Sequence, residues 1–512
     1  MAVAYNNMPG DIRVPGAYFE INAGIPPYSG TSRTLLLGRK LAGGSAQLGI
    51  PINLGAGDPN SLFGPGSMLA EMAIIARWHN PNGEIWALPV TDPSGTAATD
   101  TIAITGTATA AGTLVRYIAG ERYSVGVAVG DTAATVAAAL KAAIDKGYTK
   151  YNRAQLAPVT TSVATGTITL TARHVGTEGN SIRVEAGLDG NEVDPAGLTV
   201  TIASATLTGG TGDVDLATAL AALGDQPFDH IGGPYSSTAQ LNAVRQFLSD
   251  SGSGRWSPTV GLYGHFFTTN SGNLSAQTSL GSGRNDPHVS ILGLNNYPQA
   301  PWAWVAALTA VVGFSKNLGR SVTEAVEIAR PLQTLVLQGL RGPKSVSDQW
   351  KMADRDSLYR NGISAVVFRA DGQAALDRVV TTYQTNAWGQ ADTTFLDVEP
   401  VYIAAYAARY FKQRILATYP RSVLKDENPR SVQGVTTPAQ IRATLIHAYR
   451  EMFDGGLAEK PELFAEYVIV ERSADPNRVN AYIPFDVANQ LRVFAANVTI
   501  FPELNDQIAA LQ

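Results

Sequence analysis

The sequence predicts an α/β and α+β multidomain fold: an α/β host domain with an inserted β-rich domain, a C-terminal α+β domain, and extended N- and C-terminal arms. Three observations support this prediction. A chain of 512 residues is too long for a single hydrophobic core. Short apolar strands alternate with helical patterns, which is typical of an α/β layer. A stretch over residues 93–213, rich in Thr, Ala and Gly, breaks that alternation.

The chain is expected to begin with an extended arm over residues 1–24. Pro15, and Pro26 and Pro27 just beyond the arm, disfavour helix. Residues 17–21 are long enough for one short strand.

The first part of the host domain is predicted over residues 25–92. Residues 34–38 form an apolar run that is typical of a buried strand. A helix is expected from Ser67 to Asn80, where Pro81 ends it, and residues 84–90 follow as a second strand.

An inserted α+β domain is predicted over residues 93–213. Its helix is expected over residues 132–146, with Asp131 as the cap and Gly147 as the stop. The strands are expected at 101–105, 113–118, 123–129, 165–174 and 180–187. The host pattern resumes directly afterwards, as an insertion requires.

The second part of the host domain is predicted over residues 214–345. Strands are expected at 257–266 and 288–294. Residues 302–314 are apolar on every side but too short to span a bilayer, so we predict a buried helix after Pro301. A further helix is expected after Arg320 because Ser321 and Glu324 have the spacing of a capping box.

The C-terminal domain is predicted over residues 346–490. A helix is expected to end at Asn361–Gly362. Strands at 363–369 and 375–383 are joined across Asp371–Gly372, a strong hairpin dipeptide.

Two longer helices complete this predicted domain. The first covers residues 396–420. The second begins with Thr437, Pro438 and Gln440, a capping box with proline at the first helical position, and ends at Gly455–Gly456.

The last predicted element is a strand near the C-terminus, within an arm over residues 491–512. Phe494, Ala496, Val498 and Ile500 alternate with a second face, which is typical of a half-buried strand. Termini are usually frayed and polar. The pattern therefore raises the question of what this strand pairs with.

Composition argues against several functional classes. Charged residues make up only 16% of the chain, against about 25% in a typical soluble protein, which favours a surface partly covered by other molecules. The net charge of −5 and the absence of a basic stripe argue against nucleic-acid binding. Zero cysteines exclude disulfides and thiolate metal sites. The N-terminus lacks the features of a secretory signal.

The search for catalytic, cofactor and metal residues finds none. The six histidines are never closer than 23 residues, and none has the spacing of a helical metal site. The acidic pairs Asp397/Glu399 and Asp354/Asp356 could suggest hydrolytic carboxylates. Asp397 and Glu399 open a helix, however, where the dipole favours negative charge. We therefore expect these acids to be structural and the protein not to be an enzyme.

Basic residues gather on and after the long helix. Lys412, Arg414, Arg421 and Lys425 are interleaved with acids. Such a cluster is typical of a solvated face, and the alternative is a surface that faces another protein.

Several segments resemble the contractile tail sheath proteins of Mu-like phages. They are residues 329–343, 358–367, 378–399 and 470–501, and residues 14–20 resemble the family's N-terminal arm. Their order and spacing together are specific, and the resemblance covers most of the chain.

The resemblance implies a structural subunit that polymerises as stacked helical rings around a tail tube. Contraction of the rings drives the tube through the envelope of a target cell. The implied partners are further copies of the chain, the tube protein, and the baseplate and tail terminator proteins, without nucleic acid, membrane insertion or cofactors. The implied location is the virion tail, assembled in the host cytoplasm.

The resemblance also assigns roles to particular regions. The domain at 346–490 would lie innermost and the insertion would face outward. The arms would add strands to the sheets of neighbouring subunits, through Val14, Tyr18, Phe19, Ile21, Phe494, Ala496, Val498, Ile500 and Phe501. The candidate tube-facing residues are Lys412, Arg414, Arg421 and Lys425.

Two alternatives stay open at this point. A β-rich surface hydrolase or adhesin could use the glycine–serine loops to line a site. Within the sheath class, the chain could belong to a phage-tail-like bacteriocin.

Overall fold

The computed structural model of the chain describes residues 30–498 and residue 500. The described residues form two compact units. The larger comprises Ser32–Asn317, Glu327–Ala405 and the described residues from Val487 onward. The smaller comprises Leu318–Val326 and Tyr406–Asp486, with residues 30 and 31.

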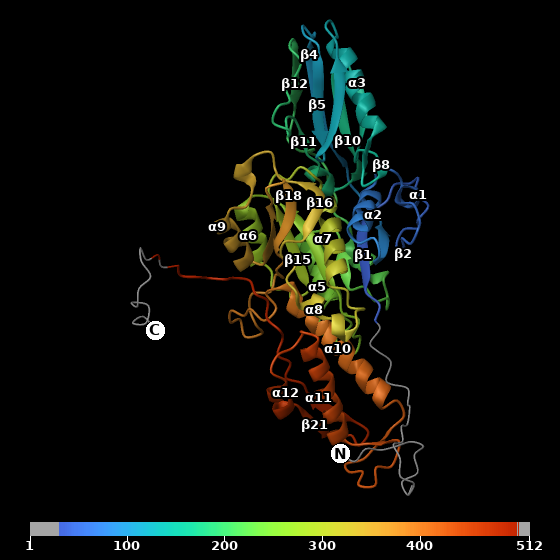
Figure 1. Ribbon diagram of the computed structural model, residues 1–512. Helices are drawn as coiled ribbons and strands as arrows, with labels where there is room; N and C mark the ends of the chain where they lie inside the picture. The colour runs from blue at the N-terminus through green and yellow to red at the C-terminus, as the bar shows by residue number, and fades with distance from the viewer. Residues whose placement is uncertain (1–29, 499, 501–512) are drawn as a thin grey trace, which may run out of the picture. The chain divides into compact units, whose positions relative to one another are not determined.

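A nine-stranded sheet forms the core of the larger unit (Figure 1). Six adjacent strands run parallel in the order β17–β15–β14–β13–β1–β3. They are β1 (Arg33–Arg39), β3 (Glu84–Val90), β13 (His230–Gly232), β14 (His265–Ser271), β15 (Val289–Leu294) and β17 (Ile363–Phe368). Every residue of β13 and β15 is buried, as expected for parallel strands covered on both faces.

Antiparallel strands complete the sheet at both edges. They are β2 (Ile52–Asn53), β16 (Val336–Arg341) and β18 (Gln373–Arg378). Strands β17 and β18 form the predicted hairpin, in which Gly372 has φ +77° and the Asp371 side chain accepts from the Gln373 amide at 3.0 Å. The second strand ends at Arg378, earlier than predicted, and both strands extend the sheet begun by the host strands.

Helix α7 (Pro301–Ser315) is the predicted buried helix, and it packs against β1, β13 and helix α2 (Met68–His79). The contact is close at Gly313, where an added Cβ would collide with the Thr34 hydroxyl of β1. Among the residues described, no helix is long and apolar enough to cross a membrane.

Shorter helices connect the other strands of the larger unit. They are α1 (Pro59–Phe63), α4 (Leu216–Ala221), α5 (Thr238–Phe247), α6 (Leu274–Ser282), α9 (Met352–Arg360) and the 3₁₀ turn η3 (Val346–Asp348). Helices α6 and α9 pack against each other and against β17.

Three further sheets, built from the stretch between β3 and α4, are separate from the nine-stranded sheet. Their strand orders are β12–β4–β10–β9, β11–β5–β6 and β7–β8. The elements are β4 (Ala97–Gly106), β5 (Gly112–Ile118), β6 (Glu121–Val127), α3 (Ala133–Lys146), β7 (Tyr148–Lys150), β8 (Arg153–Gln155), β9 (Val159–Ala164), β10 (Thr167–Val175), η1 (Thr177–Ser181), β11 (Val184–Glu185) and β12 (Leu198–Ile202). Helix α3 packs against the two larger sheets (Figure 1).

The smaller unit is built around helices. Helix α10 (Val398–Thr418) begins in the larger unit and continues into the smaller one, which also holds α11 (Pro438–Asp454) and α12 (Pro461–Tyr467). The small strands are β19 (Val423–Leu424), β20 (Val435–Thr436), β21 (Ile469–Arg472) and β22 (Val479–Tyr482). The capping box of α11 is confirmed. The Thr437 side chain accepts a hydrogen bond from the Gln440 amide, and the Gln440 side chain accepts one from the Thr437 amide.

Three local predictions are wrong. The strand predicted at 257–266 begins only at His265, because Tyr263 and Gly264 have φ values of +60° and +117° that no strand accommodates. Ser321 makes no capping hydrogen bond, and only the 3₁₀ turn η2 (Val322–Glu324) and the four-residue α8 (Val326–Ala329) follow it. Helix α3 is capped by Thr132, while the Asp131 carboxylate accepts from the Ala128 amide.

Candidate functional site

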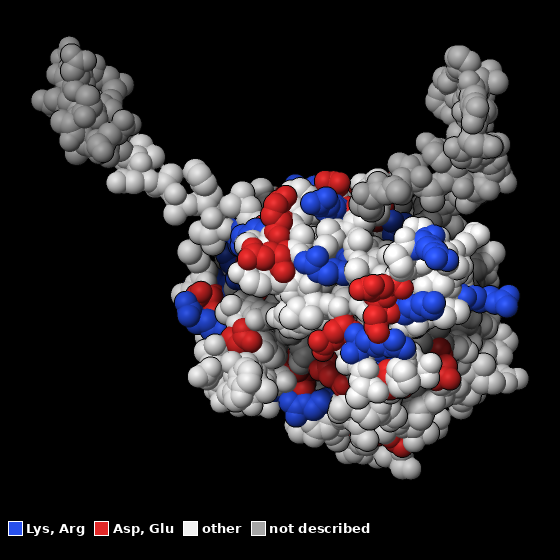
Figure 2. All heavy atoms as spheres, turned by 90° about the horizontal axis from the view of Figure 1, so that it is seen from below, with Lys and Arg blue, Asp and Glu red and all other residues white. Residues whose placement is uncertain are grey.

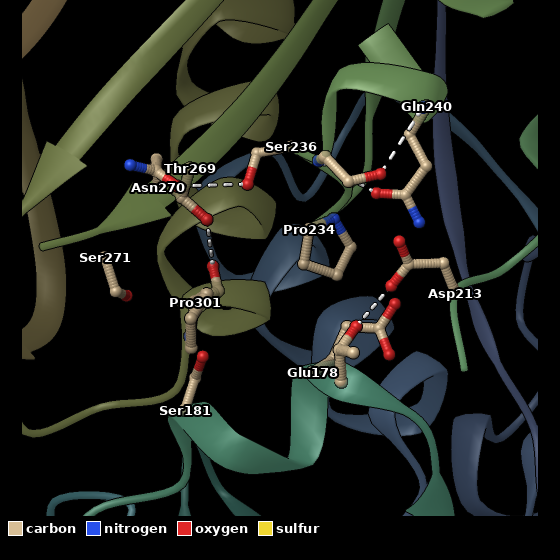
Figure 3. Close-up of a pocket in the computed structure, with 12 residues that line it drawn as sticks. Glu178, Ser181, Asp213, Pro234, Ser236, Gln240, Thr269, Asn270, Ser271 and Pro301 are labelled. Atoms are coloured by element: carbon tan, nitrogen blue, oxygen red, sulfur yellow. Dashed lines mark hydrogen bonds between the residues drawn. The ribbon is translucent and has the colours of Figure 1, made fainter. Parts of the chain in front are cut away.

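A polar hollow of about 380 Å³ lies at the carboxyl ends of β13 and β14 (Figure 3). The chain passes from β1 to β3 on one side of β1 and returns to β13 on the other, so the strand order reverses here. Ligands of open α/β sheets bind at such a switch point. The hollow is lined by Thr177, Glu178, Ser181, Asp213, Pro234, Ser236, Ser237, Gln240, Thr269, Asn270, Ser271 and Pro301.

An ion cluster around the fully buried Arg39 side chain lies beside this hollow. The Arg39 guanidinium, at the end of β1, lies 3.0 Å from the Glu178 carboxylate and 3.8 Å from Asp92. Burial raises the pKa of Glu178, and Arg39 opposes that rise. His174 lies 3.6 Å from Asp92, and burial lowers the pKa of this histidine. Glu178, which follows β10, therefore places a carboxylate against the charged side chain at the carboxyl end of β1.

The side chains of the hollow do not form a phosphate site. Glu178 and Asp213 present carboxylates, and Asp213 accepts a hydrogen bond from the Thr177 hydroxyl at 2.6 Å (Figure 3). Ser237 and Gln240 are engaged with each other in the capping box of α5. A phosphate would meet like charge here, which is unfavourable.

The histidines do not converge on a metal ion within the described ranges. No group of three or more His, Asp or Glu side chains there has the arrangement of a metal site. His230 instead lies 2.6 Å from the Tyr402 hydroxyl, and His265 lies 2.9 Å from the Ser290 hydroxyl.

The C-terminal arm is the most exposed apolar segment described. Phe494, Val498 and Ile500 are 84%, 80% and 87% exposed, and Ala496 is also exposed. None of residues 491–498, nor residue 500, is in a strand, so the predicted terminal strand does not form among the described residues (Figure 1). The physical reason is that a strand needs a hydrogen-bonded neighbour, and the described part of this chain supplies none.

Buried ion pairs hold the root of this arm. The Arg492 guanidinium lies 2.8 Å from Glu399 and 3.3 Å from Asp397, and Glu399 is fully buried. The other Glu399 oxygen accepts from the Leu332 amide at 2.9 Å. Asp397 also pairs with Arg378 at 2.7 Å. The predicted structural role of the acids that open α10 is therefore consistent with their contacts: they fasten the chain where the arm leaves.

A two-stranded sheet of the smaller unit offers unpaired edges. Strands β21 and β22 pair only with each other among the described strands. Ile469 and Tyr482, opposite each other in this pair, are 55% and 62% exposed.

An aromatic hollow of about 520 Å³ adjoins this sheet. The Tyr449 ring stacks on Phe464 at 3.8 Å between centroids. Exposed Leu463 and Tyr467 line the opening, with Lys460 and Asp486 beside them. An apolar strand could be added here and bury its side chains.

The predicted tube-facing residues differ in their surroundings. Lys412, Arg421 and Lys425 are exposed, but Arg414 is mostly buried and pairs with Glu451 at 3.1 Å. The ion pair of Arg414 with Glu451 thus joins α10 to α11. Figure 2 shows lysines and arginines interspersed with acids on the face that it presents.

The remaining predicted arm residues lie outside the described residues. They are Val14, Tyr18, Phe19, Ile21 and Phe501.

Comparison with known proteins assigns the family. Residues 209–382 match the model of the phage tail sheath protein central domain, and residues 390–501 match that of the phage tail sheath C-terminal domain. A Mu-like prophage FluMu tail sheath protein from Haemophilus influenzae is 35% identical over 503 residues, which cover 97% of this chain and 99% of that protein. The chain belongs to the phage tail sheath family. The predicted resemblance is confirmed, and this sheath protein is a structural subunit of a contractile virion tail.

Solved structures of low sequence identity were also found. Sheath tail proteins from Desulfitobacterium hafniense and Listeria innocua are 13% and 12% identical, with TM-scores of 0.47 and 0.46. The match to the Desulfitobacterium protein covers 93% of this chain and 97% of that protein. The match to the Listeria protein covers 90% of this chain and 93% of that protein. A chain of the anti-feeding prophage baseplate is 13% identical, with a TM-score of 0.46, over 96% of this chain and 99% of its own. The family assignment rests on the sequence matches.

Sequence reasoning missed two parts of this site. Arg492 and Glu399 are separated by 93 positions, and nothing in the local pattern pairs them. The β21–β22 sheet is not among the elements that the sequence predicts. Its sequence, Tyr467 to Phe485, does contain two alternating runs around Asp475–Pro476, a turn signal that could have identified the hairpin.

Proposed function

We propose that the sheath protein polymerises as stacked helical rings around a tail tube, with each copy lending its C-terminal arm to a neighbouring copy. The observation that carries this proposal is the arm itself. Residues 494–500 have the apolar alternation of a strand, yet the described ones among them, 494–498 and 500, are exposed and in no strand, while Arg492 fixes the root. Apolar segments are exposed in this way when another molecule covers them.

The receiving site that we propose is the β21–β22 sheet of the next copy. Its edges have free hydrogen-bonding groups, and the aromatic hollow beside it can accept apolar side chains. A strand donated head to tail is a heterologous contact, which generates an open helix when repeated.

The energetics favour many arms acting together. Strand addition would form roughly five main-chain hydrogen bonds at about 1 kcal/mol net each. Four apolar side chains would contribute roughly 2 kcal/mol apiece. Ordering about ten residues costs roughly 1–2 kcal/mol each, so one isolated arm is near balance. A lattice engages its arms at high effective concentration and is therefore stable.

Contraction would then drive the tube through the envelope of the target cell. It requires only that the contracted lattice has a lower free energy than the extended one, so no nucleotide is needed. Further partners are the tube protein and the baseplate and tail terminator proteins, and assembly takes place in the host cytoplasm. We also propose that residues 346–490 lie innermost and that residues 93–213 face outward.

The arm proposal is tested on the purified full-length chain. The triple variant Phe494→Ser, Val498→Ser, Ile500→Ser should prevent tube formation in negative-stain micrographs, and deletion of 491–512 should do the same. Ala495→Ser with Asn497→Ser, on the other face of the strand, is the matched control and should assemble. The triple variant should remain folded and soluble, because the substituted side chains are exposed. The truncated chain should also fold, although it is less stable because it lacks Arg492, the partner of the buried Glu399. Normal tubes from the triple variant or the truncated chain would overturn the proposal.

We propose that Lys412, Arg421 and Lys425, which are exposed, face the tail tube. Arg414 is left out because it pairs with Glu451. Charge reversal by Lys412→Glu should weaken co-sedimentation with the tube and leave sheath–sheath assembly intact. Arg414→Glu should instead destabilise the fold, because it places a second acid beside Glu451. Unchanged tube binding by Lys412→Glu with Arg421→Glu would refute this placement.

A further inference from the structure

A short loop of the larger unit presents an exposed tryptophan at the tip of a tight turn. Asn386 and Gln390 are joined by a backbone hydrogen bond of 2.9 Å. The Asn386 side chain accepts from the amides of Trp388 and Gln390 at 3.0 Å each. Gly389 takes φ +76°, which other residues rarely adopt, and its amide donates to the Asn386 carbonyl at 2.9 Å. The backbone around Trp388 is therefore fixed by its own hydrogen bonds.

The base of the loop is fastened to the body of the unit. The Asn285 side chain accepts from the amides of Gln384 and Thr385 at 2.7 and 3.1 Å, and donates to the Thr385 carbonyl at 2.9 Å. The Tyr383 hydroxyl donates to Asp392 across the loop at 2.7 Å. The tip is thus held in place from both sides of its base.

Trp388 contributes almost nothing to the fold that holds it. Its side chain is 84% exposed, although tryptophan is normally highly buried. Tryptophan is among the residues most enriched at the energetic centre of protein interfaces. A loop whose backbone is already fixed loses little conformational entropy on binding, so a tip of this kind is well suited to docking.

The loop and the root of the C-terminal arm lie on one continuous face. Two hollows, of about 430 and 260 Å³, share Asp356, Tyr359 and Arg378 as lining residues. The first is lined by the Trp388 loop through Gln384, Ala391 and Asp392, and the second by Arg492 and Val493 of the arm root. Met352 of α9, 83% exposed, also lines the second. We call this surface, from the Trp388 loop across α9 to the arm root, the α9 face.

The length of the arm limits where its acceptor can lie. An extended chain advances at most about 3.5 Å per residue, so Ile500 lies within roughly 25 Å of Val493. The copy that receives this segment must therefore have its acceptor within roughly 25 Å of the arm root, which borders the α9 face.

We infer that the α9 face is the docking surface for a second copy of this chain and that Trp388 is its anchor. The inference rests on the proposed function, in which the arm engages a second copy. The face also carries polar groups of the kind found at the rim of an interface, because the exposed side chains of Asp356 and Arg360 pair at 2.9 Å.

The first test is the variant Trp388→Ala in the full-length chain. The critical concentration for tube assembly, measured by sedimentation, should rise at least tenfold, while the melting temperature of the unassembled protein stays unchanged. Trp388→Phe should restore most of the assembly. Val193→Ala is the control, because Val193 is also highly exposed, at 83%, but lies outside this face. This variant should assemble as the wild type does. An unchanged critical concentration for Trp388→Ala would overturn the inference.

The second test identifies the occupant. The photoreactive residue p-benzoylphenylalanine is placed at position 388. Tubes are assembled from a mixture of copies with ordinary isotopes (light) and copies with heavy isotopes (heavy), and are then irradiated. Light–heavy cross-links support a second copy as the occupant, whereas cross-links only within single copies, or none, overturn it. The two proposals fail differently: if the arm variant blocks assembly and Trp388→Ala does not, only the docking inference is lost. Failure of the wild type to assemble would remove both.

Discussion

Replacing Arg492 with alanine should loosen the root of the C-terminal arm without unfolding the sheath protein. Arg492 is the direct ion-pair partner of Glu399, whose side chain is fully buried. Removing one partner of a buried pair costs about 3–5 kcal/mol, because the other charge stays buried without compensation. Asp397 retains Arg378, and Glu399 keeps the Leu332 amide and the electrostatic attraction of the buried Lys316, so the lower end of that range, about 3 kcal/mol, applies.

Hydrogen exchange measures this loss locally. A cost of about 3 kcal/mol corresponds to roughly a hundredfold faster opening of the affected amides. The increase should be confined to the amides around the arm root and the first turn of α10. Arg360→Ala is the matched control, because its pair with Asp356 is exposed and the loss should change exchange less than twofold.

The outcome of this experiment decides whether the ion pairs hold the arm. Unchanged exchange at the start of α10 in Arg492→Ala would refute the reasoning. Faster exchange spread evenly over the nine-stranded sheet would also refute it, because the effect would then be global.

Three further predictions concern the fold. Burial raises the pKa of Glu71 from its ordinary 4.5 to about 7, so the protein should lose up to about 3 kcal/mol of stability as pH rises through that interval. Glu71→Gln keeps an acceptor for the Trp302 indole N–H, bonded at 2.6 Å, and should abolish this slope in denaturant titrations at about pH 5 and pH 8. Gly313→Ala should lower the melting temperature at a cost of about 1–3 kcal/mol, although helix propensity alone favours alanine, because the new Cβ meets Thr34. Thr437→Ala should cost about 1 kcal/mol in thermal melts followed by circular dichroism, through loss of the α11 cap.

Local signals were sufficient for many elements. The apolar run at 34–38, the Asp371–Gly372 turn and the Thr437 cap each depend on residues a few positions apart, and each forms as predicted. The strand predicted at 257–266 failed because the left-handed backbone of Tyr263 and Gly264 is set by the packing around it. Propensity does not carry that information.

The sequence by itself determined the family and the apolar alternation of residues 494–500, because both are properties of residue order. Only the tertiary structure decided that the described residues of this segment, 494–498 and 500, are in no strand, that Arg492 reaches Glu399, and that the loop bearing Trp388 lines a hollow next to that of the arm root. The physical reason is that strand pairing and buried ion pairs join groups far apart along the chain. Their positions follow from the packing of the whole unit and not from any local pattern.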